Sequence, residues 1–346
     1  MIGAVLKQQG WWAYSALAIA AFALLALVIS LAVSIGEISI PLETTAKAVS
    51  NRLFGTAFEL SRIQQGIVWD YRLSRALVAA SAGASLALSG AILQALLRNP
   101  LAEPYVLGIS AGASTGAVGV MILGLGYGAL TLSGGAFIGA AIAFVLVALL
   151  AAGAGGTSER IILCGVAVSQ LFNALTSYIV TTSANAEQAR GVMFWLLGSL
   201  SGVRWPDVYL VIPVTLLGLV ISMLHVRALD AFVFGTDAAA SLGISVRRVQ
   251  IVLLGTTALM TATVVSIVGA IGFVGLVIPH AARFLIGPGH IRLLPATAVA
   301  GAMFMVGADI ISRITIPQQI LPIGVVTALF GAPAFAVILY RARRTA

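Results

Sequence analysis

The sequence has very few charged residues for its length. Of 346 residues, 19 are Lys or Arg and 11 are Asp or Glu, which is 9% of the chain, whereas 60% are hydrophobic. A soluble domain of this size covers its surface with many more polar side chains. The composition therefore excludes a soluble globular protein and indicates a chain whose outer surface faces lipid.

Cysteine and nucleotide-binding motifs are equally scarce. The single Cys164 lies in an apolar run, so no disulfide framework exists within the chain. The three histidines lack the spacing of a metal site, and no G-x-x-x-x-G-K-[ST] phosphate loop occurs. We expect no metal and no cofactor on this chain, and any nucleotide hydrolysis must be performed by another one.

Long apolar runs dominate what is present. A spanning helix needs about 20 mostly apolar residues, and lipid cannot satisfy free backbone groups. The alternation of barrel strands is missing. We predict an all-α, polytopic membrane protein with about ten transmembrane helices in a single domain over residues 1–346. The expected spans are 11–35, 72–97, 104–123, 132–152, 160–183, 206–225, 246–270, 272–287, 293–312 and 320–340.

The basic residues predict the orientation. With ten helices both termini share a side, and the tail with Arg341, Arg343 and Arg344 marks that side as cytoplasmic. The inner loops then hold 11 basic and 4 acidic residues, against 8 and 7 on the outer side. The net charge of +8 therefore reflects membrane topology, and a nucleic-acid partner is a poor interpretation of it.

Two segments outside the spans are long enough to fold on their own. Residues 36–71 carry mixed charge and predict an amphipathic helix on the outer membrane surface. In the inner loop 226–245, Thr236 or Asp237 can cap a short helix that Gly243 ends. A simple connector and a docking helix for a cytoplasmic partner are both open. The aromatic residues Phe232 and Phe234 favour the docking helix, because exposed aromatic side chains in such a loop are expected to be covered by a partner protein.

Small and polar residues within the spans predict packing and a passage. Glycines four residues apart allow close helix contact, as at Gly108, Gly112 and Gly116 and at Gly135 and Gly139. Asp309 must face protein or water, with Arg313 one turn away as its partner. Polar groups on the fifth span line a wet passage or form interhelical hydrogen bonds. Other notable polar residues in the spans are Gln94, Gln170, Asn173, His280 and Arg283.

One enzyme motif occurs, in Gly108-Ile-Ser110-Ala-Gly112, which fits the G-x-S-x-G pattern. It lacks the strand-to-helix context that this pattern requires. The chain is therefore expected to be a transporter. The rival hypotheses are an intramembrane enzyme centred on Ser110 or His280 and a passive channel.

Several longer motifs follow one another from about residue 65 to the C-terminus. They are Arg72-Leu-Ser-Arg75, the run from Gly90 through Asn99-Pro100-Leu101-Ala-Glu103-Pro104 to Ala113, Gly269-Ala-Ile-Gly272-Phe-Val-Gly275-Leu-Val-Ile-Pro279-His280-Ala-Ala-Arg283, and Leu321-Pro322-Ile-Gly324 to Pro333. Together they resemble the iron-chelate and cobalamin permeases of ABC importers, the FecCD family. Ser74 stands where the family usually has Pro, a change that should alter the start of this helix only slightly. Ile320 stands where it often has Glu.

The resemblance implies a set of partners and a cargo. Two copies of the chain would form the membrane body in the bacterial inner membrane, with two ATP-binding cassette subunits on the inner side carrying ATP and Mg. A periplasmic binding protein would deliver the cargo. Tyr105 after the Asn-Pro-Leu-Ala-Glu-Pro run favours an iron chelate, either a ferric siderophore or haem, with cobalamin as the alternative.

It also implies roles for particular residues. Arginines at the outer end would dock the binding protein: Arg72, Arg75 and Arg313. A cytoplasmic gate would be formed by Asn99, Leu101, Thr157 and Ser158. The fifth and tenth helices would line the path, with the candidates Gln170, Asn173 and Ser177. Coupling to the ATPase would use residues 230–243, in particular Asp230, Gly235, Thr236, Asp237, Leu242 and Gly243.

Overall fold

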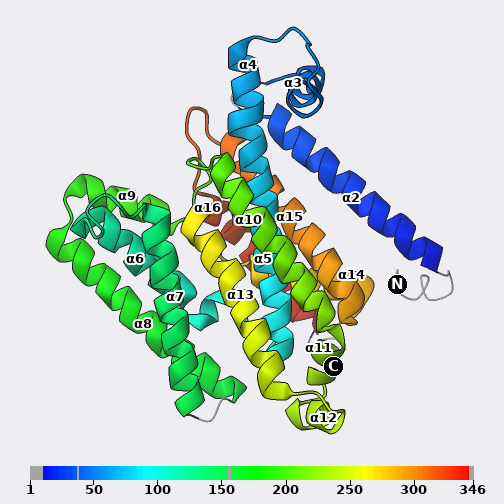
Figure 1. Ribbon diagram of the computed structural model, residues 1–346, viewed down its shortest axis with the longest axis vertical. Coiled ribbons are helices and arrows are strands. Elements are labelled where there is room, and N and C mark those ends of the chain that lie inside the picture. Colours follow the sequence, from blue (N-terminus) through cyan, green and yellow to red (C-terminus); the bar gives the residue numbers. More distant parts are fainter. Residues whose placement is uncertain (1–10, 37–38, 155–156, 343–346) are drawn as a thin grey trace.

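The computed structural model describes residues 11–36, 39–154 and 157–342. Four of the charged residues counted in the prediction of orientation lie outside these ranges, namely Lys7, Glu37, Arg343 and Arg344. Within them the chain is almost wholly helical (Figure 1). The helices are α2 (Trp11–Ser34), α3 (Leu42–Phe54), α4 (Arg62–Gly66), η1 (Ile67–Leu73), α5 (Ser74–Leu96), η2 (Pro104–Leu107), α6 (Ile109–Leu123), α7 (Leu132–Gly153), α8 (Ser158–Ser183), α9 (Ala186–Leu196), α10 (Trp205–Leu224), α11 (Val226–Phe232), α12 (Thr236–Ser241), α13 (Val246–Val268), α14 (Val274–Ile286), α15 (His290–Ile314) and α16 (Ile323–Ala342).

The apolar helices confirm a multi-pass, all-helical membrane protein. Among the described residues, seven helical stretches are long and apolar enough to cross a bilayer, while α6, α14 and α16 are shorter apolar helices. Each of the ten predicted runs overlaps one of these helices. The prediction of ten full crossings stays a prediction, because three of the helices have apolar stretches of only 10–17 residues.

Two predicted boundaries are wrong. The run expected at 104–123 is broken, because Gly108 takes a left-handed conformation (φ 72°) between η2 and α6. The run expected from 72 is extended instead, since α4, the π-helical η1 and α5 join into 35 residues from Arg62 to Leu96. Ser74 has the N–H that a proline would lack, and it donates to the Tyr71 carbonyl. Nothing therefore interrupts the helix at this point.

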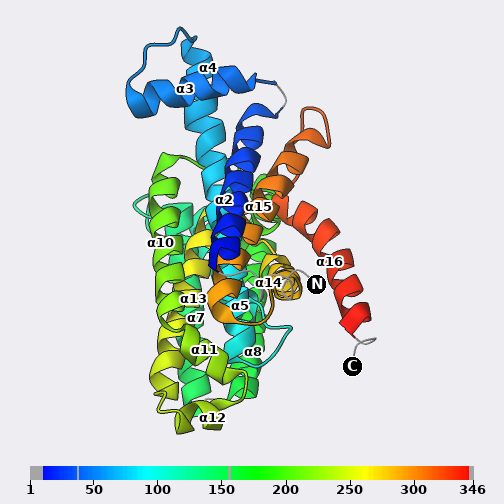
Figure 2. The same cartoon turned by 90° about the vertical axis from the view of Figure 1, so that its right-hand side faces the viewer.

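This long helix supports the outer segment. At 1.5 Å per residue, 35 residues span about 52 Å, which exceeds the hydrocarbon core of about 30 Å. Its N-terminal end, on the side predicted to be the outer one, lies beside α3 (Figure 2) and therefore projects beyond the bilayer. As predicted, a helix forms within residues 36–71. It buries Thr45 and Ala48 and leaves Leu53 and Phe54 exposed.

The core surrounds α5, which is almost completely buried. Helices α10, α13, α14 and α15 pack around it (Figure 1). Beside them, α6 and α7 cross at the predicted glycines: a Cβ on Gly112 would overlap the Gly139 carbonyl, and one on Gly116 the Gly135 carbonyl. The prediction of close helix packing at these glycines is therefore confirmed.

The chain unwinds between α13 and α14. Residues 269–273 are not helical, and both Gly269 (φ 75°) and Phe273 (φ 69°) have left-handed φ values. Non-helical backbone between spanning helices is tolerated where protein buries it or where it borders a water-filled cavity. The unwound segment lies at such a cavity.

Candidate functional site

The structure contains a cavity of about 890 Å³ between α6, α8, α16 and the unwound segment. The fifth and tenth predicted helices, α8 and α16, therefore both contribute to its walls. The residues around it are Tyr105, Ser110, Ala111, Ser114, Ser169, Asn173, Leu196, Leu197, Ala270, Gly272, Phe273, Gly324, Val325, Ala328, Leu329, Ala332 and Pro333.

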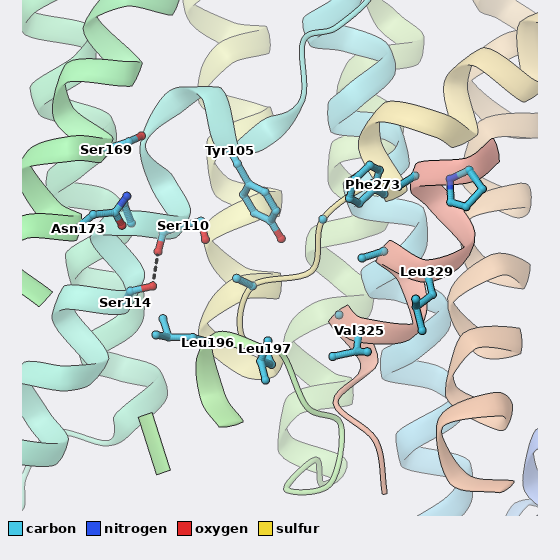
Figure 3. Close-up of a pocket in the computed structure, with 17 residues that line it drawn as sticks. Tyr105, Ser110, Ser114, Ser169, Asn173, Leu196, Leu197, Phe273, Val325 and Leu329 are labelled. Carbon is cyan, nitrogen blue, oxygen red and sulfur yellow. Dashed lines mark hydrogen bonds between the residues drawn. The ribbon is translucent and has the colours of Figure 1, made fainter. Parts of the chain in front are cut away.

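The cavity has a polar side and an apolar side (Figure 3). Hydroxyl and amide groups come from α6 and α8, where Ser114 Oγ donates to the Ser110 carbonyl at 2.9 Å. Apolar side chains come from the end of α9 and from α16, including Leu197 and Leu329. The 17 described lining residues include no charged side chain. Such walls can contact a bulky solute without holding it by ion pairs.

The predicted pathway residues divide between the cavity and the surface. Asn173 lines the cavity, whereas Gln170 and Ser177 are exposed on α8 outside its wall. An interhelical hydrogen bond is formed by another residue of α8, since Thr176 Oγ1 lies 2.8 Å from Thr115 Oγ1. The sequence analysis missed Ser114 and Ser169 because serines are common throughout the spans.

Tyr105 fixes the unwound segment in place. Its hydroxyl donates to the Ile271 carbonyl at 2.8 Å and accepts from the Ile271 N–H at 2.6 Å. One side chain thus satisfies both backbone groups of a residue that has left the helix. The hydroxyl is engaged within the chain, so Tyr105 is a structural residue here and a poor indicator of the cargo.

The outer arginines are buried and cap α2. The exposed fractions of Arg72, Arg75 and Arg313 are 6%, 2% and 6%. Arg72 Nη1 donates to the carbonyls of residues 33 and 34, each at 3.0 Å, and Arg313 donates to those of residues 32 and 35, each at 2.8 Å. These carbonyls end a helix and lack intrahelical donors. The guanidinium groups supply the donors.

A single buried carboxylate joins this cluster. Asp309 Oδ1 lies 2.8 Å from both Nε and Nη2 of Arg75, and Oδ2 lies 3.1 Å from Arg313 Nε. The predicted pair of Asp309 and Arg313 is confirmed, and Arg75 is a second partner. In this arrangement all three guanidinium groups point into the chain. The role of the α2 carbonyls could not be predicted from the sequence, because every residue has a backbone carbonyl.

The inner loop folds into two short helices, with two corrections to the predictions. Gly235 (φ 113°), rather than Thr236 or Asp237, occupies the N-cap of α12, and no side chain caps it. Phe232 is buried at 1% exposure, because α11 turns it into the core. Phe234 is 79% exposed, as expected. Two coupling candidates follow the helix: Leu242, 73% exposed, and Gly243, with a left-handed φ of 79°.

Asp230, a third coupling candidate, is tied to α15. Its Oδ1 accepts from the His290 backbone N–H at 3.0 Å and lies 2.6 Å from His290 Nδ1. The His290 side chain is 3% exposed, whereas that of Asp230 is 46% exposed. The inner loop is therefore held to the first turn of a spanning helix.

The proposed gate residues lie in turns at the inner end of the spans. Asn99 Oδ1 accepts from the Leu101 N–H at 2.9 Å, and Leu101 is 51% exposed. Thr157 is the N-cap of α8 and Ser158 its first residue. In the same turn as Leu101, burial raises the pKa of the Glu103 carboxyl.

Comparison with known proteins identifies the family. Residues 24–341 match the FecCD transport family. The chain belongs to this family. It is 40% identical to the cobalamin import system permease BtuC of Halobacterium salinarum, over 82% of this chain and 75% of the relative. It is 38% identical to the Fe(3+) dicitrate transport system permease FecD of Escherichia coli, over 80% and 86%.

Two further comparisons cover more of the chain. The ABC transporter permease YvrB of Bacillus subtilis, described as uncharacterised, is 39% identical over 93% of both chains. A solved structure of a proposed metal-chelate type ABC transporter, in an inward-facing conformation, superposes with a TM-score of 0.83 at 29% identity, covering 95% of this chain and all of the other. This FecCD member is therefore a multi-pass permease of an ABC importer, a class whose permeases are not themselves enzymes.

Proposed function

We propose that two copies of this chain enclose a passage through which a metal chelate, either an iron chelate or cobalamin, is imported. The uncharged cavity carries this proposal. Its walls α8 and α16 also bear exposed apolar side chains, among them Leu171, Leu175, Leu329 and Phe330. A second copy placed against these helices would cover them and close the cavity into a passage.

The partners act at opposite ends of the membrane body. ATP-binding cassette subunits, which hold ATP and Mg, dock on α11 and α12 at the cytoplasmic end, where both termini also lie. A periplasmic binding protein docks at the outer end, near Arg72, Arg75 and Arg313. Because these arginines are occupied by α2 and Asp309, carboxylates of the binding protein would have to compete for them.

Transport follows from a population shift. ATP binding and hydrolysis favour different arrangements of the docked cassettes, and the permease adopts the conformation that each arrangement stabilises. Asn99 and Leu101, with Thr157 and Ser158 on the facing helix, close the inner mouth. Asn173 lines the path, and the facing surface of the second copy brings Gln170 and Ser177 to it.

Reconstitution tests this function. Liposomes containing the permease, its ATPase and its binding protein should take up ⁵⁵Fe-dicitrate or ⁵⁷Co-cyanocobalamin only with ATP, and vanadate should abolish uptake. Parallel assays with the two tracers decide between the two cargo classes. Uptake by the permease alone without nucleotide would contradict the proposal and favour a passive channel. A chemical conversion that Ser110→Ala abolishes would favour the rival intramembrane enzyme.

A further inference from the structure

Helix α14 connects the cytoplasmic loop to the cavity wall. It begins after Phe273, which lines the cavity, and ends at Gly287, whose N–H donates to the Arg283 carbonyl at 2.9 Å. Only residues 287–289 separate it from His290, which Asp230 of α11 binds through two contacts. A displacement of α11 therefore acts directly on the inner end of α14.

A proline interrupts this helix in its middle. Pro279 has no N–H, so the Gly275 carbonyl lacks the donor that a residue four positions later normally supplies. Gln94 of α5 replaces it: its Nε2 donates to the Gly275 carbonyl at 3.2 Å and lies 3.4 Å from the Leu276 carbonyl. The two helices can approach this closely because Gly90 packs directly on Gly275, where a Cβ would overlap the carbonyl.

The same amide also holds the far side of the interruption. Gln94 Oε1 accepts from Arg283 Nη1 at 2.5 Å, one turn beyond Pro279. Gln94 is only 5% exposed. Both ends of a buried amide are thus satisfied by one helix, with contacts to Gly275 and Leu276 before Pro279 and one to Arg283 after it.

We propose that Gln94 is the positioning residue about which α14 turns when the cytoplasmic loop moves, so that Phe273 and the cavity wall move with it. This inference rests on the proposed docking of the ATPase at α11 and α12. The proline interruption supplies the flexible point that such a movement needs. The edge-on contact between His280 of α14 and Phe335, with ring centroids 6.2 Å apart, carries the movement to α16, which also lines the cavity.

The test measures the cavity wall directly and needs no cargo. The full complex with its ATPase, in lipid nanodiscs, carries Cys164→Ala and Ala270→Cys, which places one thiol on the unwound segment. We measure the rate at which a charged, membrane-impermeant maleimide labels this thiol, both without nucleotide and with ATP plus vanadate. We expect the nucleotide-dependent change in this rate to fall at least fivefold in Gln94→Leu, while ATP hydrolysis stays within twofold of the parent.

A matched control lies on α5, the helix that carries Gln94. Ser85→Ala removes a buried hydrogen bond to Thr215 (2.7 Å) that does not involve α14, and it should leave the response unchanged. In a second test, Pro279→Ala returns an N–H to the Gly275 carbonyl and removes the flexible point, so this variant alone should also reduce the response. If Gln94→Leu fails to fold, Gln94→Glu retains the acceptor for Arg283 and should give an intermediate response.

Three outcomes would overturn the inference: a full response in Gln94→Leu, or in Gln94→Glu where that variant is used; an equal loss in Ser85→Ala; or a full response in Pro279→Ala. A parent complex without any nucleotide-dependent change would instead count against the proposed function itself. The two failures are therefore distinguishable.

Discussion

The predicted outer and inner ends of the molecule differ in which of their side chains find partners within the chain. At the outer end, Arg72 and Arg313 are hydrogen-bonded to the end of α2, and Arg75 and Arg313 are paired with Asp309. At the inner end, α11 and α12 leave Phe234 and Leu242 largely exposed. The buried charges of the outer end are thus satisfied within the chain, whereas the inner end presents apolar side chains at the site proposed for the ATPase.

The largest effect should come from breaking the outer charge cluster. Asp309→Ala leaves Arg75 and Arg313 buried beside each other without a carboxylate. Removing one partner of a buried ion pair typically costs about 3–5 kcal/mol. We therefore expect a large drop in the denaturation midpoint of the purified protein, measured by urea unfolding in detergent.

The matched control for this variant is an exposed ion pair at the same end. Glu43→Ala removes the carboxylate that lies 2.6 Å from Lys47 Nζ, and solvent screens such pairs. Its midpoint should equal that of the wild type. Equal midpoints for Asp309→Ala and the wild type would show that the cluster does not stabilise the fold.

At the inner end, substitution should affect binding and leave stability unchanged. Phe234→Ser combined with Leu242→Ser removes two exposed apolar side chains, and we expect at least tenfold weaker co-purification of the ATPase. Phe54→Ser at the outer end is the control, because Phe54 is also 79% exposed. An equal loss in both variants would mean that exposed aromatic surface, rather than the inner docking site, governs recovery of the complex.

The sequence predicted those features that local patterns encode. Apolar runs located the helices, glycines four residues apart located the crossing of α6 and α7, and the spacing of Asp309 and Arg313 by one helical turn located an ion pair. Each depends on residues close together in sequence. The resemblance to a known family then indicated the transport class, which the comparisons confirm.

Features that depend on distant residues could not be predicted in this way. Arg75 meets Asp309 across 234 positions, and Gln94 meets Arg283 across 189. The burial of Phe232 depends on how α11 packs against the core. The seven residues of α11 do not determine that packing by themselves. Likewise, the bonds from Arg72 and Arg313 to α2 could not be predicted, because their acceptors are backbone carbonyls.

A smaller effect should follow from loosening the end of α2. Arg72→Gln removes the charged donor to the Val33 and Ser34 carbonyls, and a hydrogen bond to a charged group contributes about 1.5–3 kcal/mol. The last turn of α2 should open more often, so its amides should exchange roughly tenfold or more faster by hydrogen–deuterium exchange. Exposed Arg52→Gln is the control, and equal exchange in both variants would contradict the capping role.

The smallest effect concerns Glu103 in the inner turn and depends on pH. Because burial raises the pKa of this carboxyl in the folded protein, its ionised form opposes folding. The contribution of this carboxyl to the free energy of unfolding is greatest at low pH. It decreases as the pH rises from the unfolded pKa of about 4.3 towards the folded pKa. Glu103→Gln should therefore melt slightly above the wild type at pH 8, by a few degrees at most, with no difference near pH 4. A difference that widened on acidification would contradict this sign and show that the ionised Glu103 carboxylate is stabilised in the folded state.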